Sequence, residues 1–196
     1  MGIAAASASA HPPPWVAIRS ELLYALDGSV NSVRHAWTFD DMFSASATTG
    51  LKKANGTFSL DTLQALAKVN VESLKDYSIF AYAKINGRQQ KGVFSTATEY
   101  WAEYDPKESV LTLHFTLPFK KPIKEKSLEI DAYNPEFFVD FGFAKSKPVT
   151  VVGAPAQCKL ATDQPPDSNF PSLFFKLDLS MTITEANIGK GCQLRQ

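Results

Sequence analysis

Four dipeptides typical of tight turns divide much of this 196-residue chain into segments of alternating apolar and polar residues. They are Asp27-Gly28, Asn86-Gly87, Asp105-Pro106 and Asn134-Pro135. Alternation with a period of two is the pattern of a half-buried strand, and these dipeptides favour the turns that join antiparallel strands. The pattern predicts a mainly β fold, an antiparallel β-sandwich or a curled sheet, rather than a parallel α/β fold.

The turns predict the positions of the strands. We expect Trp15–Leu26 and Val30–Phe39 across a two-residue type I′ turn, Tyr77–Ile85 before the second turn, Thr96–Tyr104 and Val110–Leu117 around the third, Leu128–Tyr133 and Phe137–Phe143 around the fourth, and a short strand over Lys147–Val152. Asp163–Pro171 is expected to be a loop. The apolar segment Leu173–Ile183 is ambiguous between helix and strand, and a final strand should bring Cys192 to Cys158.

The period becomes helical between about residues 40 and 75, which predicts a helical insert in the β domain. Its apolar stripe consists of Leu63, Leu66, Ala67, Asn70 and Leu74. Ser59 is placed to cap this helix.

The segment Leu51–Thr62, before and at the start of that helix, has the length of an EF-hand loop. Leu51, Lys53 and Thr62 occupy its first, third and twelfth positions, where calcium needs oxygen ligands and a bidentate Glu. We therefore expect no calcium binding there.

Charge and hydropathy exclude several classes of protein. Twenty Lys and Arg balance twenty Asp and Glu, so no overall positive field favours nucleic acid, and we expect no nucleic-acid partner. No window of about 18 apolar residues is present, so no helical membrane span is expected. The length fits a single domain, which we place at residues 11–196.

Residues 1–10 resemble the end of a secretory signal. Ala8-Ser9-Ala10 fits a cleavage site directly before His11, although a flexible Ala/Ser leader without targeting meaning is the alternative. Cys158 and Cys192 form an even pair, which in an exported chain indicates a disulfide, and their spacing matches no zinc motif. These features predict an exported protein.

Common catalytic signatures are missing, including G-x-S-x-G, the P-loop and H-E-x-x-H, so we expect no enzyme and no organic cofactor. The three histidines form no short-range ligand pair. Alternation puts His114 on a solvated strand face and His35 on an inward face, where a hydrogen-bonded core histidine is a better interpretation than a metal ligand.

Carboxylates carry the remaining chemistry. Thr38 and Asp41 fit a capping box, which leaves Asp40 free as a candidate ligand. Asp131 and Asp140 are expected on the polar face of the fourth hairpin, with Glu136 at its turn. Such hard oxygen groups can bind divalent metals, but surface hairpins also carry acids for solubility alone.

Several blocks resemble one bacterial family. They are His11-Pro12 followed by Trp15-Val16, Trp37-Thr38-Phe39-Asp40-Asp41-Met42-Phe43-Ser44, the degenerate calcium-loop segment with its helix, Leu113-His114-Phe115-Thr116-Leu117-Pro118, and Ala132-Tyr133-Asn134-Pro135-Glu136-Phe137-Phe138. The chain is similar over His11 to about Cys158 to the periplasmic domain-of-unknown-function 1007 family, described as an uncharacterised ABC-type transport component. Members are commonly encoded beside nickel, cobalt or zinc permeases. The resemblance implies a role in divalent-metal traffic and an inner-membrane permease as partner.

The chain departs from the family where a metal site would be expected. Pro13 and Ala17 stand where members usually carry a histidine and an acid, Asn134 replaces the Asp of an Asp-Pro turn, and Phe138 replaces a frequent Tyr. The metal ligands that we predict are His11, Asp40, Glu136 and Asp140, with zinc, nickel or cobalt as the metal. After cleavage behind Ala10, the amine and imidazole of His11 could chelate one ion.

Two function classes therefore stand side by side. One is a periplasmic accessory protein of metal transport that binds metal weakly or docks on a permease. The other is a β-sandwich interaction module without metal or small ligand, whose exposed aromatics contact a protein partner. A hydrolase built on Asp40, Asp41, Asp131 or Glu136 ranks behind both, because no spacing places a nucleophile beside a base.

Overall fold

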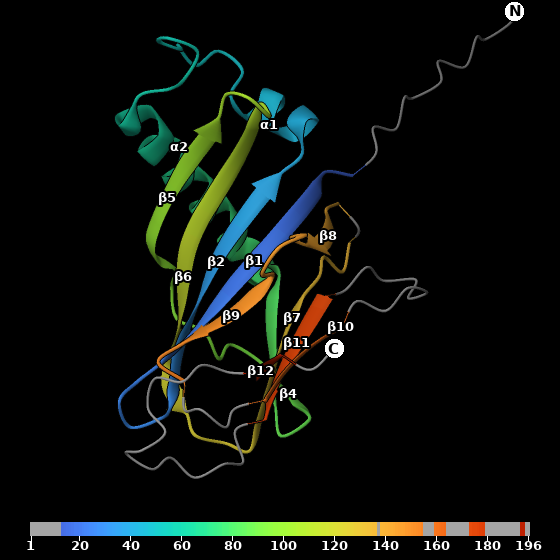
Figure 1. The fold of residues 1–196 in the computed structure, drawn as a ribbon. Helices are drawn as coiled ribbons and strands as arrows, with labels where there is room; N and C mark the ends of the chain where they lie inside the picture. The colour runs from blue at the N-terminus through green and yellow to red at the C-terminus, as the bar shows by residue number, and fades with distance from the viewer. Residues whose placement is uncertain (1–12, 137, 155–158, 164–172, 179–192, 195–196) are drawn as a thin grey trace, which may run out of the picture.

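The structure is a computed structural model that describes residues 13–136, 138–154, 159–163, 173–178 and 193–194. Within these ranges twelve strands form two open six-stranded sheets, which confirms the mainly β prediction (Figure 1). His11, Cys158 and Cys192 lie outside the described residues. No helix in the described part of the chain is long and apolar enough to cross a membrane.

The first sheet has the order β5-β6-β2-β1-β8, with β9 beside β1 after β8. Its strands are β1 (Trp15–Tyr24), β2 (Val30–Phe39), β5 (Thr98–Asp105), β6 (Val110–Ile123), β8 (Asp140–Phe143) and β9 (Val149–Val152). β1, β2, β6 and β5 pair in antiparallel fashion, whereas β8 and β9 run parallel to β1 along its free edge. The start of β1 therefore lies between the end of β2 and the start of β8.

The second sheet has the order β12-β10-β11-β7-β3-β4. Its strands are β3 (Ala81–Ile85), β4 (Arg88–Gln90), β7 (Ser127–Ala132), β10 (Lys159–Asp163), β11 (Leu173–Asp178) and β12 (Gln193–Leu194). The ambiguous segment after residue 172 thus begins as a strand, β11. β12 pairs with β10 in parallel, with Gln193 opposite Lys159, so the residues that follow the two cysteines are register partners.

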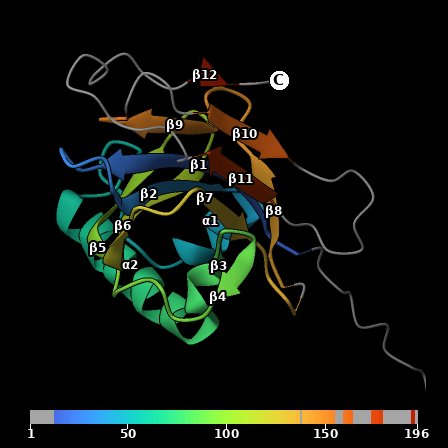
Figure 2. The same ribbon diagram turned by 90° about the horizontal axis from the view of Figure 1, so that it is seen from below.

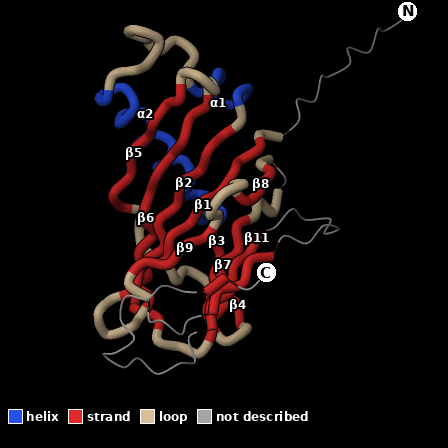
Figure 3. Tube along the Cα trace, in the orientation of Figure 1, coloured by secondary structure: helices blue, strands red, loops and turns tan. Residues whose placement is uncertain are grey.

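The helical insert between β2 and β3 is confirmed (Figure 3). It consists of α1 (Asp41–Ala47), α2 (Leu60–Leu74) and the 3-10 segment η1 (Lys75–Phe80). The Ser59 hydroxyl accepts the Thr62 N–H at 3.2 Å and caps α2 as expected. Leu63, Ala67 and Val71 are buried, whereas Leu66 and Leu74 are only partly buried.

The core fills the space on one side of the first sheet. Figure 2 shows α2 and the β3–β4 hairpin on this same side. One buried cluster lies beneath α2 and includes Trp37, Leu63, Phe115 and Phe141. A second lies between the two sheets and includes Leu22, Val33, Leu128, Ile130 and Leu160.

Two of the predicted turns differ from the structure. The first hairpin has a three-residue loop, Leu26–Gly28, closed by a bond from the Ala25 N–H to the Ser29 carbonyl (2.8 Å), and not the two-residue type I′ turn. Gly28 adopts φ 76°, as a type I turn with a following left-handed residue requires. By contrast, Asn86 and Gly87 both have positive φ and form the expected two-residue turn between β3 and β4.

The fourth predicted hairpin is wrong. β7 pairs with β3 and β11 in the second sheet, whereas β8 pairs with β1 in the first. The Asn134 side chain accepts the Glu136 N–H at 2.9 Å, so this turn redirects the chain from one sheet to the other. A turn motif of this kind changes the direction of the chain but does not decide which strand the next one pairs with.

Candidate functional site

Asp40 lies between β2 and α1 as the N-cap of the helix, and both its carboxylate oxygens are hydrogen-bonded. Oδ1 accepts the Phe43 N–H at 2.7 Å, which is the N-cap bond of α1, and Oδ2 accepts the Trp15 N–H at 2.6 Å. The Asp40 N–H in turn donates to the Trp15 carbonyl at 3.0 Å. The side chain therefore fastens the start of β1 to the start of a helix.

The predicted capping box is wrong by this arrangement. Thr38 does not cap the helix, because its hydroxyl bonds to the Thr112 hydroxyl on the neighbouring strand at 2.9 Å. Asp41 is the first helical residue, and its Oδ1 accepts the adjacent Met42 N–H. Asp40, which the predicted capping box left free as a candidate metal ligand, is therefore the residue that caps α1.

Asp140 lies on the other side of the start of β1. It is the first residue of β8 and the register partner of Trp15, and its N–H donates to the Pro14 carbonyl at 2.9 Å. Its half-buried carboxylate bonds to no group among the described residues. Asp40 and Asp140 thus flank Trp15, and we call these three residues the N-terminal edge.

The third described candidate, Glu136, is exposed in the connection between the sheets. Within the described ranges no three His, Cys, Asp or Glu side chains lie close enough together to hold a metal ion. The structure therefore brings Asp40 and Asp140 to one strand end but does not assemble Glu136 with them as a ligand group. His11 lies outside the described residues.

Asp131 does not share a hairpin face with Asp140, contrary to the prediction. It is buried in β7, where its Oδ2 is 3.0 Å from the Lys84 Nζ on β3, and Lys84 also pairs with Glu129. Burial, assisted by the neighbouring Glu129 carboxylate, raises the pKa of the Asp131 carboxyl, and the Lys84 ammonium opposes that shift. These three residues form a polar cluster within the second sheet.

His35 points into the core, as the alternation predicted. Its Nδ1 lies 2.9 Å from the Ser20 hydroxyl, while Nε2 has no hydrogen-bond partner among the described residues. The ring packs against Trp37 and Phe115. Complete burial lowers the pKa of His35 to about 3, so the ring is neutral and part of the core.

His114 lies on the outer face of the first sheet, as predicted, but its side chain is only partly exposed, which corrects the expectation of a fully solvated position. The Trp101 ring on β5 stacks on it, with centroids 3.6 Å apart and planes at 4°. Nε2 is 3.2 Å from the Glu103 Oε1, close enough for an ion pair but misaligned for a hydrogen bond. Burial lowers the pKa of His114, although Glu103 opposes that shift.

An apolar cavity of about 230 Å³ opens beside the N-terminal edge. Its walls include Trp37, Phe43 and Phe80, together with Tyr77 and Phe138, which are 45% and 60% exposed. The Trp37 Nε1 has no hydrogen-bond partner among the described residues. The sequence signal for this cavity was the block Trp37-Thr38-Phe39. Its two aromatic residues are two positions apart and so share the inward face of the strand, and Phe43 follows four residues after Phe39.

Trp15 closes the edge on the outer side of the sheet. Its indole lies across Gly142 of β8, where an added Cβ would come within 1.9 Å of the Trp15 Cζ2. The ring nevertheless remains 46% exposed. The N-terminal edge therefore combines one bonded carboxylate, one free carboxylate and accessible aromatic surface.

A family model described as "Protein of unknown function (DUF1007)" matches residues 1–182 and confirms the resemblance found in the sequence. No curated protein matches the chain.

Proposed function

Because the chain belongs to the DUF1007 family, whose function is unknown, no activity carries over to it, and we propose one. We propose that it is a periplasmic accessory protein of divalent transition-metal transport. It binds zinc, nickel or cobalt weakly at the N-terminal edge and docks on an inner-membrane permease. This is a binding role and not an enzymatic one.

One observation carries the proposal: Asp40 and Asp140 flank the strand end that leads back to His11. His11 precedes Trp15 by four residues, a span of at most about 14 Å, so its imidazole and a free amine can reach either carboxylate. These nitrogen donors suit nickel, copper and zinc, and a carboxylate can complete the coordination.

The carboxylates fit a weak metal site better than a tight one. Asp140 has both oxygens available, whereas each Asp40 oxygen already accepts a backbone N–H and keeps only its remaining lone pair. His11 and Asp140 would be the principal ligands, Asp40 a weaker one, and Glu136 a ligand only after movement of its connection. A protein that delivers metal to a permease needs such exchange.

Calorimetric titration with zinc and nickel tests the proposal on protein matured at His11. We expect one ion per chain, and a loss of about tenfold or more in affinity for both His11→Ala and Asp140→Asn. Glu108→Gln, at an exposed acid in the turn between β5 and β6, should bind as the parent does. Equal heats for the parent and the His11→Ala and Asp140→Asn variants would contradict the metal site.

The interaction module remains the second candidate, and the exposed aromatics favour it. Tyr77 and Phe138 line an apolar cavity that can receive one side chain of a partner, and the exposed Trp15 lies at the neighbouring strand end. A metal permease in nanodiscs would then bind the parent protein equally well with and without metal, and Phe138→Ala would weaken binding. Binding that requires metal would instead favour the first proposal.

A further inference from the structure

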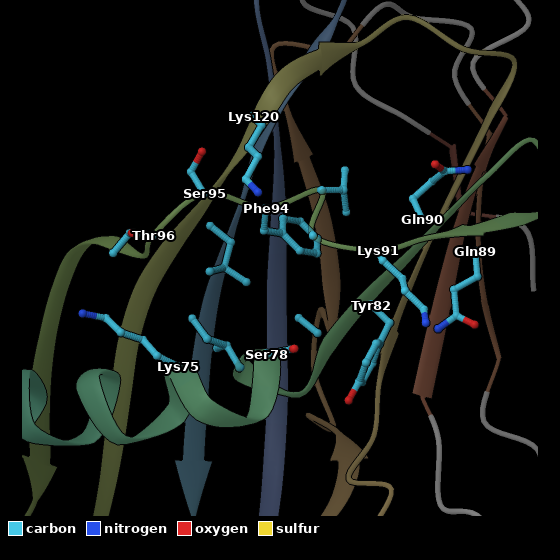
Figure 4. A pocket seen from close by; sticks show the side chains of 15 residues that line it. Lys75, Ser78, Tyr82, Gln89, Gln90, Lys91, Phe94, Ser95, Thr96 and Lys120 are labelled. Carbon is cyan, nitrogen blue, oxygen red and sulfur yellow. The ribbon is translucent and has the colours of Figure 1, made fainter.

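A larger cavity, of about 590 Å³, lies on the side of the molecule where η1 meets the β3–β4 hairpin (Figure 4). The segment 93–96 before β5 and Lys120 of β6 complete its wall. Its apolar residues are Ile79, Ala81, Val93, Phe94 and Leu117. This volume lies within the range of about 300–1,000 Å³ that is usual for small-molecule sites.

The polar lining of this cavity is basic. Three lysines from three separate segments contribute to it, namely Lys75, Lys91 and Lys120, and no Asp or Glu lines it. In Figure 4 the Lys120 amino group points toward Phe94, and the Lys91 amino group lies near Tyr82 and Gln89. We call this cavity the basic pocket.

The positive charge continues beyond the basic pocket into an adjoining groove. The groove shares Gln90, Lys91, Val93 and Lys120 with the pocket and adds Arg88, Lys121 and Lys124. Its one lining acid, Glu125, accepts a hydrogen bond from Asn86, and Lys124 pairs with Asp27.

Five cations of the pocket and groove have no carboxylate partner among the described residues: Lys75, Arg88, Lys91, Lys120 and Lys121. The chain as a whole is neutral, so this is a local concentration of unpaired positive charge. A concave wall focuses such a field and raises the local concentration of anions.

The wall formed by η1 is held in an unusual backbone conformation. Ser78, Ile79 and Phe80 have φ values of 54°, 53° and 48°, in the left-handed region that β-branched and aromatic residues avoid. The buried side chains of Ile79 and Phe80 fix this conformation from the core. Strain of this kind persists only where the surroundings determine it, and it is concentrated at ligand sites.

We propose that the basic pocket binds a small organic anion that carries either two or more carboxylates or a phosphate group. Its charged groups lie between Lys91 and Lys120, and its apolar or aromatic body packs on Phe94. Gln89, Gln90 and the hydroxyls of Ser95 and Thr96 offer further hydrogen bonds. This site is separate from the N-terminal edge and does not depend on metal binding.

Calorimetry with citrate and with phenyl phosphate tests the proposal at low and high salt. We expect one ligand per chain and weaker binding as salt increases. Lys91→Gln and Lys120→Gln should each lower affinity about fivefold or more, and the double variant further, because each removes a charge-assisted contact. Lys68→Gln, on the exposed face of α2, is the matched control and should leave binding unchanged.

Phe94→Ala separates the two parts of the ligand. It should weaken phenyl phosphate more than inorganic phosphate, because only the former has a ring to pack. Phe94 also stacks on Phe119, with centroids 4.9 Å apart, so thermal unfolding must confirm that the variant is folded. If Phe94→Ala is not folded, the lysine variants still test the proposed site.

A phospholipid headgroup carries the same oxyanion chemistry, and vesicles distinguish that source. The vesicles contain phosphatidylcholine and phosphatidylglycerol. If the protein binds these vesicles, if citrate displaces it from them and if both lysine variants lose the binding, the site exists and its ligand is a lipid. No binding of citrate, phenyl phosphate or these vesicles would overturn the proposal. So would binding that Lys91→Gln and Lys120→Gln leave unchanged.

Discussion

The N-terminal edge and the basic pocket use charge in opposite ways. At the edge, Asp40 accepts two backbone N–H groups and its charge helps to fasten the strand to the helix. At the pocket, Lys91 and Lys120 pair with no carboxylate among the described residues. Asp40 at the edge therefore uses its charge to hold the fold together, whereas the two lysines of the pocket leave theirs available to a ligand.

This difference shows what residue type alone can indicate. A lone acid beside a strand end resembles a metal ligand in sequence, yet nearby N–H groups can bond to both its oxygens and weaken it as a ligand. Lysines on separate segments form no recognisable sequence motif, yet the fold can bring them to one cavity. Buried or bonded partners, and not residue identity, decide which charges remain for binding.

The largest expected effect concerns the sheet that contributes to the basic pocket but not to the N-terminal edge. The β3–β4 hairpin at the basic pocket belongs to the sheet whose other edge is β12 and β10, where Gln193 pairs with Lys159. Cys158 and Cys192 immediately precede these partners, and we expect them to be disulfide-bonded. Reduction should lower the unfolding free energy by about 4 kcal/mol, as expected for a loop of this length.

Thiol titration of the unfolded, unreduced protein measures the disulfide directly. Two reactive thiols per chain would contradict it and would remove one argument for a periplasmic location. Denaturant unfolding with and without reductant then measures the contribution of the disulfide to the unfolding free energy. The control is the Cys158→Ser/Cys192→Ser double variant, whose stability should not change with reductant.

The next effect is a pH dependence of the unfolding free energy, caused by the titration of His35 in β2, the strand that leads to Asp40. Its pKa of about 3 in the folded protein lies below the value of about 6.5 expected when unfolded. Between these two pKa values the unfolded chain binds more protons than the folded protein. The unfolding free energy is therefore not reduced by His35 above about pH 6.5, and it decreases as the pH falls toward 3. The loss should be about 2 kcal/mol at pH 5.

Urea unfolding between pH 8 and pH 5 checks this effect. His35→Gln should flatten the profile, because an amide can bond to Ser20 but does not titrate. His114→Gln is the matched control and should keep most of the slope. An unchanged slope in His35→Gln would mean that other groups cause the acid sensitivity.

Much of the fold could be predicted from the sequence, because local signals determine it. Alternation located β1 and β2, and the cap at Ser59 with its apolar stripe located α2. The pairing of β7 and β8 could not be predicted, since each pairs with strands distant in sequence. A turn motif carries no information about those partners.

The candidate site was less predictable than the fold. The predicted capping box placed the N-cap at Thr38 with Asp41 as its partner, whereas the observed N-cap is Asp40, two residues later, so the acid expected to be free is the one that caps the helix. The lysines of the basic pocket, Lys75, Lys91 and Lys120, are far apart along the chain. They meet at one cavity only because η1, the segment after β4 and β6 come together in the folded structure.

A smaller effect tests the structural role of Asp40 directly. Asp40→Ala should lower the unfolding free energy by about 1–2 kcal/mol, because it removes the cap of α1 and leaves the Trp15 N–H without its acceptor. Thermal or urea unfolding measures the change. Asp41→Ala should cost less, since its carboxylate bonds only to the adjacent N–H among the described residues, and Lys120→Gln should stay within about 0.5 kcal/mol. Equal losses at Asp40 and Lys120 would remove the contrast between the two regions.

The smallest expected effect concerns Asp140, which shares the N-terminal edge with Asp40 but not its bonds. Asp140→Asn should change the unfolding free energy by less than about 0.5 kcal/mol, because the carboxylate bonds to no described group and the backbone bond to Pro14 does not involve the side chain. Urea unfolding of Asp140→Asn beside Asp40→Ala measures the contrast within a single strand end. A loss as large as that of Asp40→Ala would mean that Asp140 also holds the fold together. Stability equal to that of the parent, together with weaker zinc binding, would assign Asp140 to the ligand alone.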